Sequence, residues 1–309
     1  MTDTSIGVVG LGLMGGNIAT HFLDAGWDVH GFDVSDERVA DLETDGLVPA
    51  ETAAALADEV DVVITSLPTP DVVDTVYLGD DGIAAGAGDG VTAIDMSTID
   101  PNTTRTVAES APAIDLIDAP VSGGPENCLD GTLVILCGGN RDVYDREYVQ
   151  EILDSLGRNV YYAGETGAGH TVKLLNNVIS MGNLLLSLEV TSMGVAAGVE
   201  PEVLNEILPN TGGASNQFRK RFPRVLNRNF EPGFTVDYAK KDIGLAMDTA
   251  ENEEVPMVLS SLIYQLFTKA SAEGHGGEDA CSVVKLFEQS TGVPVEADTE
   301  VDETFEGYR

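Results

Sequence analysis

The chain has 309 residues, of which 52 are acidic and only 16 are basic, so its formal net charge is −36. A field of that sign and size repels nucleic-acid phosphates and anionic membranes, which excludes both classes of partner. Apolar residues still make up 43% of the chain, enough to bury a core, so we expect a folded protein whose acidic surface suits a high-salt cytosol, with an ordinary acidic protein as the alternative.

The first half of the chain alternates short apolar strands with helical segments. Its strands are rich in Val and Ile without strict alternation, which is typical of strands covered on both faces. This repetition predicts an α/β domain with a parallel, doubly wound sheet. The expected strands are residues 5–9, 28–32, 61–67, 91–96, 114–119 and 133–137, and the first helix is residues 15–25.

The pattern becomes helical after residue 164. Gly167 and Gly169 interrupt the chain, and residues 170–197 then run without proline and with apolar side chains at helical spacing, which predicts one long helix. The expected domains are an α/β domain at 1–164, an all-helical domain at 165–292 and a frayed acidic tail at 293–309. Further helices are expected at 201–208, 237–252, 255–273 and 278–290.

A glycine-rich sequence follows the first strand directly and opens the first helix: Gly10-Leu11-Gly12-Leu13-Met14-Gly15. In a dinucleotide-binding turn the first glycine permits the tight bend, the second admits the pyrophosphate, and the third lets helix and strand pack closely. The helix N-terminus then faces the anion. This strand-turn-helix context predicts a Rossmann-type domain. The alternative is a glycine turn in a domain that binds no nucleotide.

The second strand ends at Asp33, about 20 residues after the glycine motif. A carboxylate there would bond the adenosine ribose hydroxyls and repel a 2′-phosphate. Because no arginine follows immediately, we expect NAD as cofactor and consider NADP the weaker candidate; Asp33 as a simple turn residue is the alternative. Leu67 and Pro68, at the end of the third strand, are expected to line the same site.

A second motif, Asp118-Ala119-Pro120-Val121-Ser122-Gly123-Gly124, ends a predicted strand. Open α/β sheets bind their ligands at that edge. Ser122, Gly123 and Gly124 combine a hydroxyl group with bare backbone N–H groups, which could cradle a carboxylate. A plain glycine-rich turn explains the motif equally well.

A third group lies on the long helix, where Lys173, Asn176, Asn177 and Ser180 form one polar stripe. Residues 166–188 contain no Asp or Glu. In so acidic a chain a solvated face should carry acids, so we expect the stripe to be buried or to line a cleft. Desolvation would lower the pKa of Lys173 toward the range that is useful for proton transfer.

These residues belong to longer segments that match one family. The chain resembles the β-hydroxyacid dehydrogenases, the group that contains 3-hydroxyisobutyrate dehydrogenase and tartronate semialdehyde reductase. The segments cover nearly the whole chain in the family's order. They are VGLGLMG at 9–15, DMSTIDP at 95–101, DAPVSGG at 118–124, GTLVILCGG at 131–139, GAGHTVKLLNN at 167–177 and KKDIGLA at 240–246.

The resemblance implies a Rossmann domain followed by an all-helical domain, and an NAD(P)-dependent interconversion of a small 3-hydroxy acid and its aldehyde or semialdehyde. It implies that Lys173 is the catalytic acid/base, that Ser122, Gly123 and Gly124 hold the substrate carboxylate, and that Asn177 positions the substrate. Thr98 and Lys241 match positions that contact the nicotinamide half of the cofactor, and Phe234 and Asp242 match the pattern that places Lys241. Phe234 is also expected to contact the cofactor. The family often has Gly-Ala after its SGG motif, where this chain has Glu126-Asn127-Cys128.

Rival functions remain. An imine reductase could use the same architecture, although enzymes of that type generally lack the lysine. A 6-phosphogluconate dehydrogenase would need a much longer helical domain and a histidine at Asn176. A dinucleotide-binding module without catalysis is the non-enzyme alternative, and such relatives also lose the lysine.

The acidity also varies along the chain. Acids are absent from residues 4–23, 166–188 and 255–272, which we interpret as segments that exclude solvent, the last as a core helix. Residues 207–230 contain five bases and no acid. They could bind a second anionic group of the substrate, or contact acidic partners across a domain or subunit interface. The apolar stretch Val255–Phe267 favours an oligomer, and the family resemblance implies a homodimer or homotetramer.

The cysteine and histidine content and the apolar segments bear on where in the cell the protein resides. The three cysteines and four histidines are scattered, so we expect neither a disulfide framework nor a metal site, and a reducing, cytoplasmic location. The N-terminus has no basic segment ahead of an apolar one, so no secretory signal is expected. We expect no apolar run of the roughly 18 residues that cross a bilayer.

Overall fold

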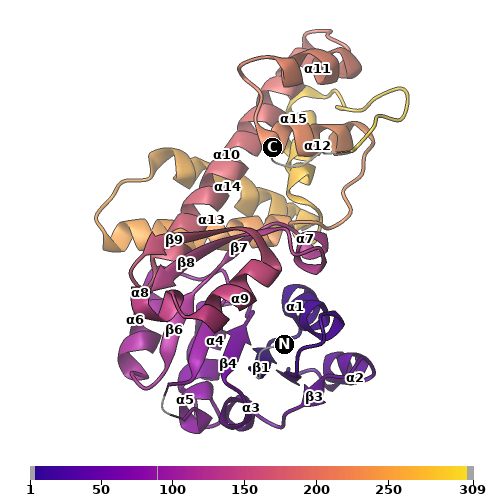
Figure 1. Ribbon diagram of the computed structural model, residues 1–309. Coiled ribbons are helices and arrows are strands. Elements are labelled where there is room, and N and C mark those ends of the chain that lie inside the picture. The colour runs from indigo at the N-terminus through magenta and orange to yellow at the C-terminus, as the bar shows by residue number, and fades with distance from the viewer. Residues whose placement is uncertain (1–3, 89, 305–309) are drawn as a thin grey trace. The chain divides into compact units, whose positions relative to one another are not determined.

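The computed structural model describes residues 4–88 and 90–304 and contains two compact units, one ending at Leu174 and the other beginning at Leu175. Figure 1 presents the elements in chain order. The first unit is built on a sheet in the order β3-β2-β1-β4-β5-β6-β8-β7, with β9 paired to β8. Strands β1 to β6 are parallel, and β8 runs antiparallel to β6 and β7. The strands are Ile6–Val9, Val29–Phe32, Val48–Pro49, Val62–Thr65, Thr92–Asp95, Asp115–Asp118, Val121–Ser122, Leu133–Gly139 and Gly157–Gly164.

Helices cover both faces of this sheet. Because neighbouring residues of one strand point to opposite faces, each strand contributes side chains to two separate cores. Val62 belongs to a core formed with α1 and α9, whereas Val63 belongs to a second core formed with α3, α4 and α6. This confirms the predicted doubly wound α/β fold. The helices of the first unit are α1 (Leu13–Asp24), α2 (Asp36–Glu43), α3 (Ala53–Glu59), α4 (Pro70–Leu78), α5 (Ile83–Gly86), α6 (Pro101–Ser110), α7 (Pro125–Leu129), α8 (Arg141–Tyr144) and α9 (Glu147–Leu156).

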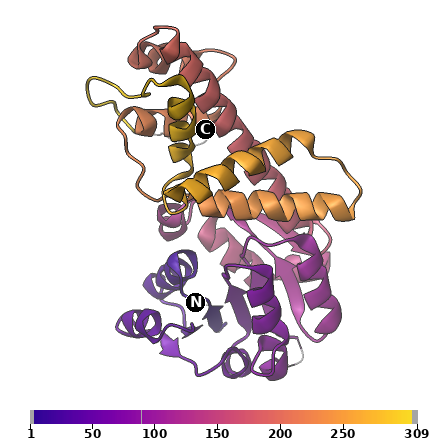
Figure 2. The same cartoon turned by 180° about the vertical axis from the view of Figure 1, so that it is seen from behind.

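Helix α10 (Ala168–Ala196) continues from the first unit into the second, which is helical throughout its regular elements. Its core gathers Leu184 and Leu188 of α10 with Phe222, Ile243 and Phe267 from later helices. Helices α13 and α14 lie side by side, in orange (Figure 2). The further elements are α11 (Pro201–Ile207), α12 (Asn216–Leu226), α13 (Val236–Asn252), α14 (Val258–Ala270), α15 (Val284–Thr291) and 3-10 helices at Leu208–Asn210 and Ala280–Val283.

Three expectations from composition are wrong. Residues 255–272 do not form a core helix along their whole length, because Val258 and Leu259 at the start of α14 are 70% and 75% exposed. An apolar window long enough to span a bilayer does exist, in α10, although a third of it is buried inside the protein. Acid-free segments therefore mark exposed apolar surface as well as core.

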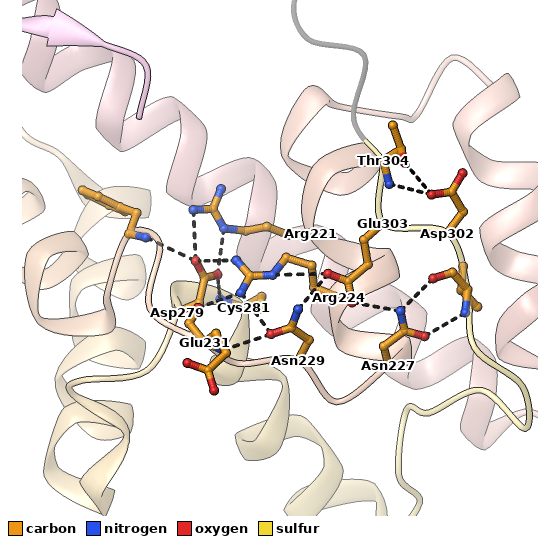
Figure 3. Close-up of polar contacts among 12 residues, drawn as sticks. Arg221, Arg224, Asn227, Asn229, Glu231, Asp279, Cys281, Asp302, Glu303 and Thr304 are labelled. Carbon is orange, nitrogen blue, oxygen red and sulfur yellow. Dashed lines mark hydrogen bonds and ion pairs between the residues drawn. The ribbon is translucent and has the colours of Figure 1, made fainter. Parts of the chain in front are cut away.

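The third wrong expectation concerns the acidic tail, which is not frayed over the residues that the structure describes. Val295 is fully buried, and its N–H donates to Glu288. Asn227 at the end of α12 donates to the Val301 carbonyl at 2.7 Å and accepts the Val301 N–H at 2.8 Å, an exchange drawn in Figure 3. Phe305 and Tyr308, the aromatic residues of the tail, lie outside the described residues.

Candidate functional site

The glycine motif forms the turn between β1 and α1. Gly10 has φ +89°, and a Cβ atom there would lie 2.5 Å from the Ser66 carbonyl oxygen. A Cβ on Gly15 would overlap the Gly10 carbonyl. At Gly12, by contrast, a Cβ would meet only an Arg38 nitrogen, at 3.9 Å. The first turn of α1 carries no acid. An open backbone beside a helix N-terminus fits the pyrophosphate of a dinucleotide. Leu11 is buried in the core behind the turn, whereas Leu13 is exposed and Met14 packs against that core.

Asp33 lies directly after β2 and faces this turn. Its carboxylate accepts hydrogen bonds from the N–H groups of Leu11, at 2.7 Å, and Ser35, at 2.8 Å. Arg38 of α2 places a guanidinium nitrogen 3.4 Å from the same carboxylate, and its side chain is 55% exposed. Sequence reasoning missed Arg38, because it looked only at the residues next to Asp33. A carboxylate suits ribose hydroxyls and a guanidinium suits a 2′-phosphate, so the geometry accommodates NAD or NADP.

The loops after β4 and β5 are joined to each other. The Leu67 N–H donates to the Ser97 hydroxyl at 2.9 Å. Pro68 is exposed and Thr98 is half-buried. Both loops leave the carboxyl ends of parallel strands, where ligands of α/β sheets bind. The predicted cofactor residues Leu67, Pro68 and Thr98 therefore lie at the appropriate edge of the sheet.

The SGG motif forms the end of β7 and the turn into α7. Gly123 has φ +140°, a backbone region that L side chains rarely adopt. The Gly124 N–H donates to the Asn127 side chain at 2.9 Å, so a carboxylate at Gly124 would have to displace that amide. Cys128 is buried, and burial raises the pKa of its thiol to about 12, so it is unreactive at neutral pH.

The polar stripe of α10 is partly buried. Lys173 lies on the second turn and is half-buried, as are Asn176 and Ser180. Asn177 is buried; its side-chain oxygen accepts from Asn176, and its amide donates to Asp242 of α13 at 2.6 Å. The second carboxylate oxygen of Asp242 is 3.0 Å from the Lys241 ammonium. These hydrogen bonds fix the orientation of the Asn176 and Asn177 side-chain amides.

A polar pocket of about 560 Å³ in the second unit begins at this stripe. Arg219 is its one charged lining residue among the residues that the structure describes, and Asp and Glu are absent from that lining. Sequence reasoning found the acid-free segment but not the pocket. Its lining is Asn176, Ser180, Asn183, Gly212, Gly213, Ala214, Ser215, Asn216, Gln217 and Arg219.

Most of the basic segment has a structural role instead. Arg221 and Arg224 of α12 both contact the buried carboxylate of Asp279, at 2.9 and 3.2 Å, and Arg224 also approaches Glu303 (Figure 3). Arg228 pairs with Glu288. Burial by itself raises the pKa of Asp279, but Arg221 and the surrounding hydrogen bonds outweigh it and hold that pKa below its usual value.

The segment preceding α13 depends on the same carboxylate. Asp279 accepts the N–H of Phe234 at 3.2 Å, and the Phe234 ring stacks on Tyr238 with 6.4 Å between centroids. Phe234 and Lys241, the two predicted cofactor contacts of the second unit, therefore flank the first turn of α13.

Comparison with known proteins covers both units. Residues 5–164 match a family model described as the NAD binding domain of 6-phosphogluconate dehydrogenase. Residues 167–287 match one described as the NAD-binding of NADP-dependent 3-hydroxyisobutyrate dehydrogenase.

Full-length relatives agree with these matches. A 3-hydroxyisobutyrate dehydrogenase of Pseudomonas aeruginosa is 36% identical over 92% of this chain and 98% of the relative. A 2-(hydroxymethyl)glutarate dehydrogenase of Eubacterium barkeri is 34% identical (94% and 97%), and a 3-sulfolactaldehyde reductase of Escherichia coli is 32% identical (94% and 97%). The crystal structure of 3-hydroxyisobutyrate dehydrogenase from Salmonella typhimurium superposes with a TM-score of 0.80 at 30% identity (92% and 100%). The chain thus belongs to the β-hydroxyacid dehydrogenases, a family of NAD(P)-dependent oxidoreductases.

Proposed function

We propose that this protein interconverts a small 3-hydroxy acid and its aldehyde or semialdehyde with NAD or NADP, using Lys173 as acid/base. The observation that carries the proposal is the polar stripe of α10. It sets a half-buried lysine one helical turn before a buried, hydrogen-bonded Asn177. The relatives named above act on substrates of this class by their names, which supports the same reaction here.

When bound, the nicotinamide cofactor supplies hydride transfer. The chain's own groups bind the substrate, orient it and move one proton. In oxidation the neutral amine of Lys173 accepts the hydroxyl proton as alkoxide character develops, and in reduction its ammonium form returns that proton to the carbonyl oxygen. The Ser122 hydroxyl and the adjoining backbone N–H groups hold the substrate carboxylate, which takes the place of the Asn127 side chain at the Gly124 N–H. Asn177 orients the reacting carbon.

Replacement of the lysine tests this proposal. Lys173→Ala should lower kcat by about 100- to 10,000-fold, the usual contribution of a positioned acid/base, while NAD binding persists. NADH formation at 340 nm in high salt measures kcat, and calorimetry measures the dissociation constant of NAD. Lys269→Ala, which removes an exposed lysine beside Glu273, is the matched control. Unchanged turnover of Lys173→Ala would refute the assignment of the lysine. Tight NAD binding without turnover by the wild-type chain would favour the non-catalytic alternative. Turnover of cyclic imines by the wild-type chain would favour an imine reductase.

The pocket of the second unit favours substrates with a second anionic or strongly polar group. Arg219 lines it, anchored by a 2.6 Å hydrogen bond from its guanidinium to the Pro209 carbonyl. A free guanidinium N–H could bind such a group. Arg219→Ala should raise KM for a dianionic substrate such as 2-(hydroxymethyl)glutarate about tenfold and leave KM for the monoanionic 3-hydroxyisobutyrate unchanged. Equal KM changes for both substrate classes would contradict this specificity.

A homo-oligomer is part of the proposal, and the exposed face of α10 supports it. Leu186, Val190 and Met193 recur at helical spacing and stay exposed in a strongly acidic chain. Leu186→Glu should lower the mass measured by light scattering to that of a monomer, whereas Val203→Glu, at an exposed site on α11, should not. Retention of the oligomer by Leu186→Glu would exclude this face.

We also propose a cytoplasmic location.

A further inference from the structure

A buried carboxylate caps the helix that carries Lys173. Asp118, the last residue of β6, is fully buried, and its two carboxylate oxygens accept the N–H groups of Gly167 at 2.8 Å and His170 at 3.0 Å. These N–H groups belong to the start of α10, where backbone donors have no partner within the helix. An anion there also interacts favourably with the helix dipole. Asp118 therefore satisfies the first turn of α10 from outside the helix.

The surroundings of Asp118 leave little freedom for any other side chain. A Cβ on Gly138, its partner across the β6–β8 pair, would lie 2.7 Å from the carboxylate. A Cβ on Gly169 would lie 2.8 Å from it. Two glycines thus make room for the carboxylate between strand β8 and the start of α10. A solvated turn would not require this arrangement.

His170 ties the same turn to the cofactor loop. Its ring is fully buried, with Nε2 3.0 Å from the Ser97 carbonyl oxygen and Nδ1 2.7 Å from the Thr104 hydroxyl. Because a carbonyl can only accept, Nε2 is the donor in the first contact, and Nδ1 pairs with the Thr104 hydroxyl in the second. Ser97 precedes Thr98 and accepts the Leu67 N–H, so the contact reaches two loops of the proposed cofactor site.

We infer that Asp118 and His170 are positioning residues for the proton transfer: they fix the first turn of α10, and with it the height and direction of Lys173 relative to the cofactor loops. This inference rests on the proposed role of Lys173, which follows His170 by three residues and so lies on the same side of the helix. Neither residue needs to touch the substrate. A lysine displaced by about 1 Å can lose about 100-fold in rate while binding is retained.

Asp118→Asn is the first test, since the amide keeps the shape but can no longer accept two backbone N–H groups. It should lower kcat about 100-fold, leave the KM of the hydroxy acid and the dissociation constant of NAD unchanged, and increase the solvent deuterium isotope effect as proton transfer limits turnover. Asp115→Asn is the matched control. It removes an acid from the opposite end of β6, where Asp115 pairs with Arg146 at 2.7 Å, and should leave all three readouts unchanged.

Asp118→Asn could fail to fold, so a milder pair keeps the test decisive. Thr104→Val removes the hydroxyl that contacts His170, whereas Thr104→Ser retains it. Valine should lower kcat and raise the isotope effect at constant KM, and serine should restore both. If valine lowers only the melting temperature, or if kcat and KM change together in both variants, the positioning role is wrong. Should Lys173→Ala itself turn over normally, the proposed function fails instead, independently of these variants.

Discussion

The side-chain amide of Asn177 donates a 2.6 Å hydrogen bond to the carboxylate of Asp242, which joins α10 to α13 inside the second unit. The other oxygen of that carboxylate lies 3.0 Å from Lys241. One buried acid therefore orients two residues to which the family resemblance assigns substrate and cofactor contacts. A buried carboxylate is tolerated because the ammonium and the amide both compensate it.

Asp242→Ala should therefore impair function as well as stability. Loss of the acceptor removes the hydrogen bond of the Asn177 amide and the ion pair of Lys241 with this carboxylate, so kcat/KM should fall at least about tenfold, the equivalent of one charged hydrogen bond of about 1.5 kcal/mol. Steady-state kinetics with NAD and a 3-hydroxy acid measure it. Asp248→Ala, at an exposed position of the same helix, should behave as wild type. Full activity of Asp242→Ala would mean that this carboxylate serves only packing.

Two glycines of the dinucleotide turn should separate folding from cofactor binding. Gly15→Ala drives a methyl group into the Gly10 carbonyl and should lower the melting temperature together with NAD affinity. Gly12→Ala meets only Arg38 at 3.9 Å, so the fold should tolerate it, while the methyl group obstructs the pyrophosphate. Thermal melts and NAD titration compare the two. Normal NAD affinity in Gly12→Ala would place the pyrophosphate elsewhere.

Cofactor choice should depend on Arg38. Arg38→Ala removes the guanidinium that could pair with a 2′-phosphate but leaves the Asp33 carboxylate for ribose hydroxyls. The ratio of kcat/KM for NADP to that for NAD should fall several-fold, mainly through KM for NADP. Asp33→Ala should change the ratio in the opposite direction. An unaltered ratio in Arg38→Ala would show that the guanidinium faces away from the bound cofactor.

The elements that carry the site could be predicted because their signals are local. The turn at Gly10 to Gly15 follows a buried strand directly, and the uninterrupted pattern after Gly169 marks one long helix. The contacts within the site could not be predicted, because they depend on tertiary structure. Asn177, for example, meets Asp242 across 65 residues of sequence. The contact of Arg38 with Asp33 spans only five residues, but it depends on the turn from β2 into α2 and is not visible from the residues next to Asp33.

Composition also failed where a few specific contacts outweigh the average. The tail is acidic, which favours disorder, yet one buried valine and the amides of Asn227 and Asn229 hold it against α12. The same holds for the basic segment, whose Arg221 and Arg224 compensate one buried acid, as Figure 3 illustrates. A run of like charges in the sequence shows where charged residues lie along the chain. It does not show which of them form ion pairs in the folded protein.

A fall in pH should destabilise the second unit through protonation of Asp279. Because the folded pKa of this group lies below its usual value, its stabilising contribution is complete above the unfolded pKa of about 3.9 and is lost as pH falls through the folded pKa. Urea unfolding between pH 6 and pH 3 should give a falling free energy of unfolding. Arg221→Met should cost about 3–5 kcal/mol at neutral pH, since it leaves a buried charge without its closest partner. An equally stable variant would indicate that Arg224 suffices.

Salt should stabilise the whole chain, because its net charge of −36 opposes compaction. Raising KCl from 0.1 to 1 M shortens the Debye length from about 10 Å to about 3 Å and so screens repulsion between exposed acids. The melting temperature should rise steeply over that range. Sodium perchlorate, which does not favour apolar burial, should reproduce the first part of the rise if screening is the cause. A melting temperature that stays constant in both salts would indicate that the surface acids are far enough apart, or well enough hydrated, to leave the fold unstrained at low salt.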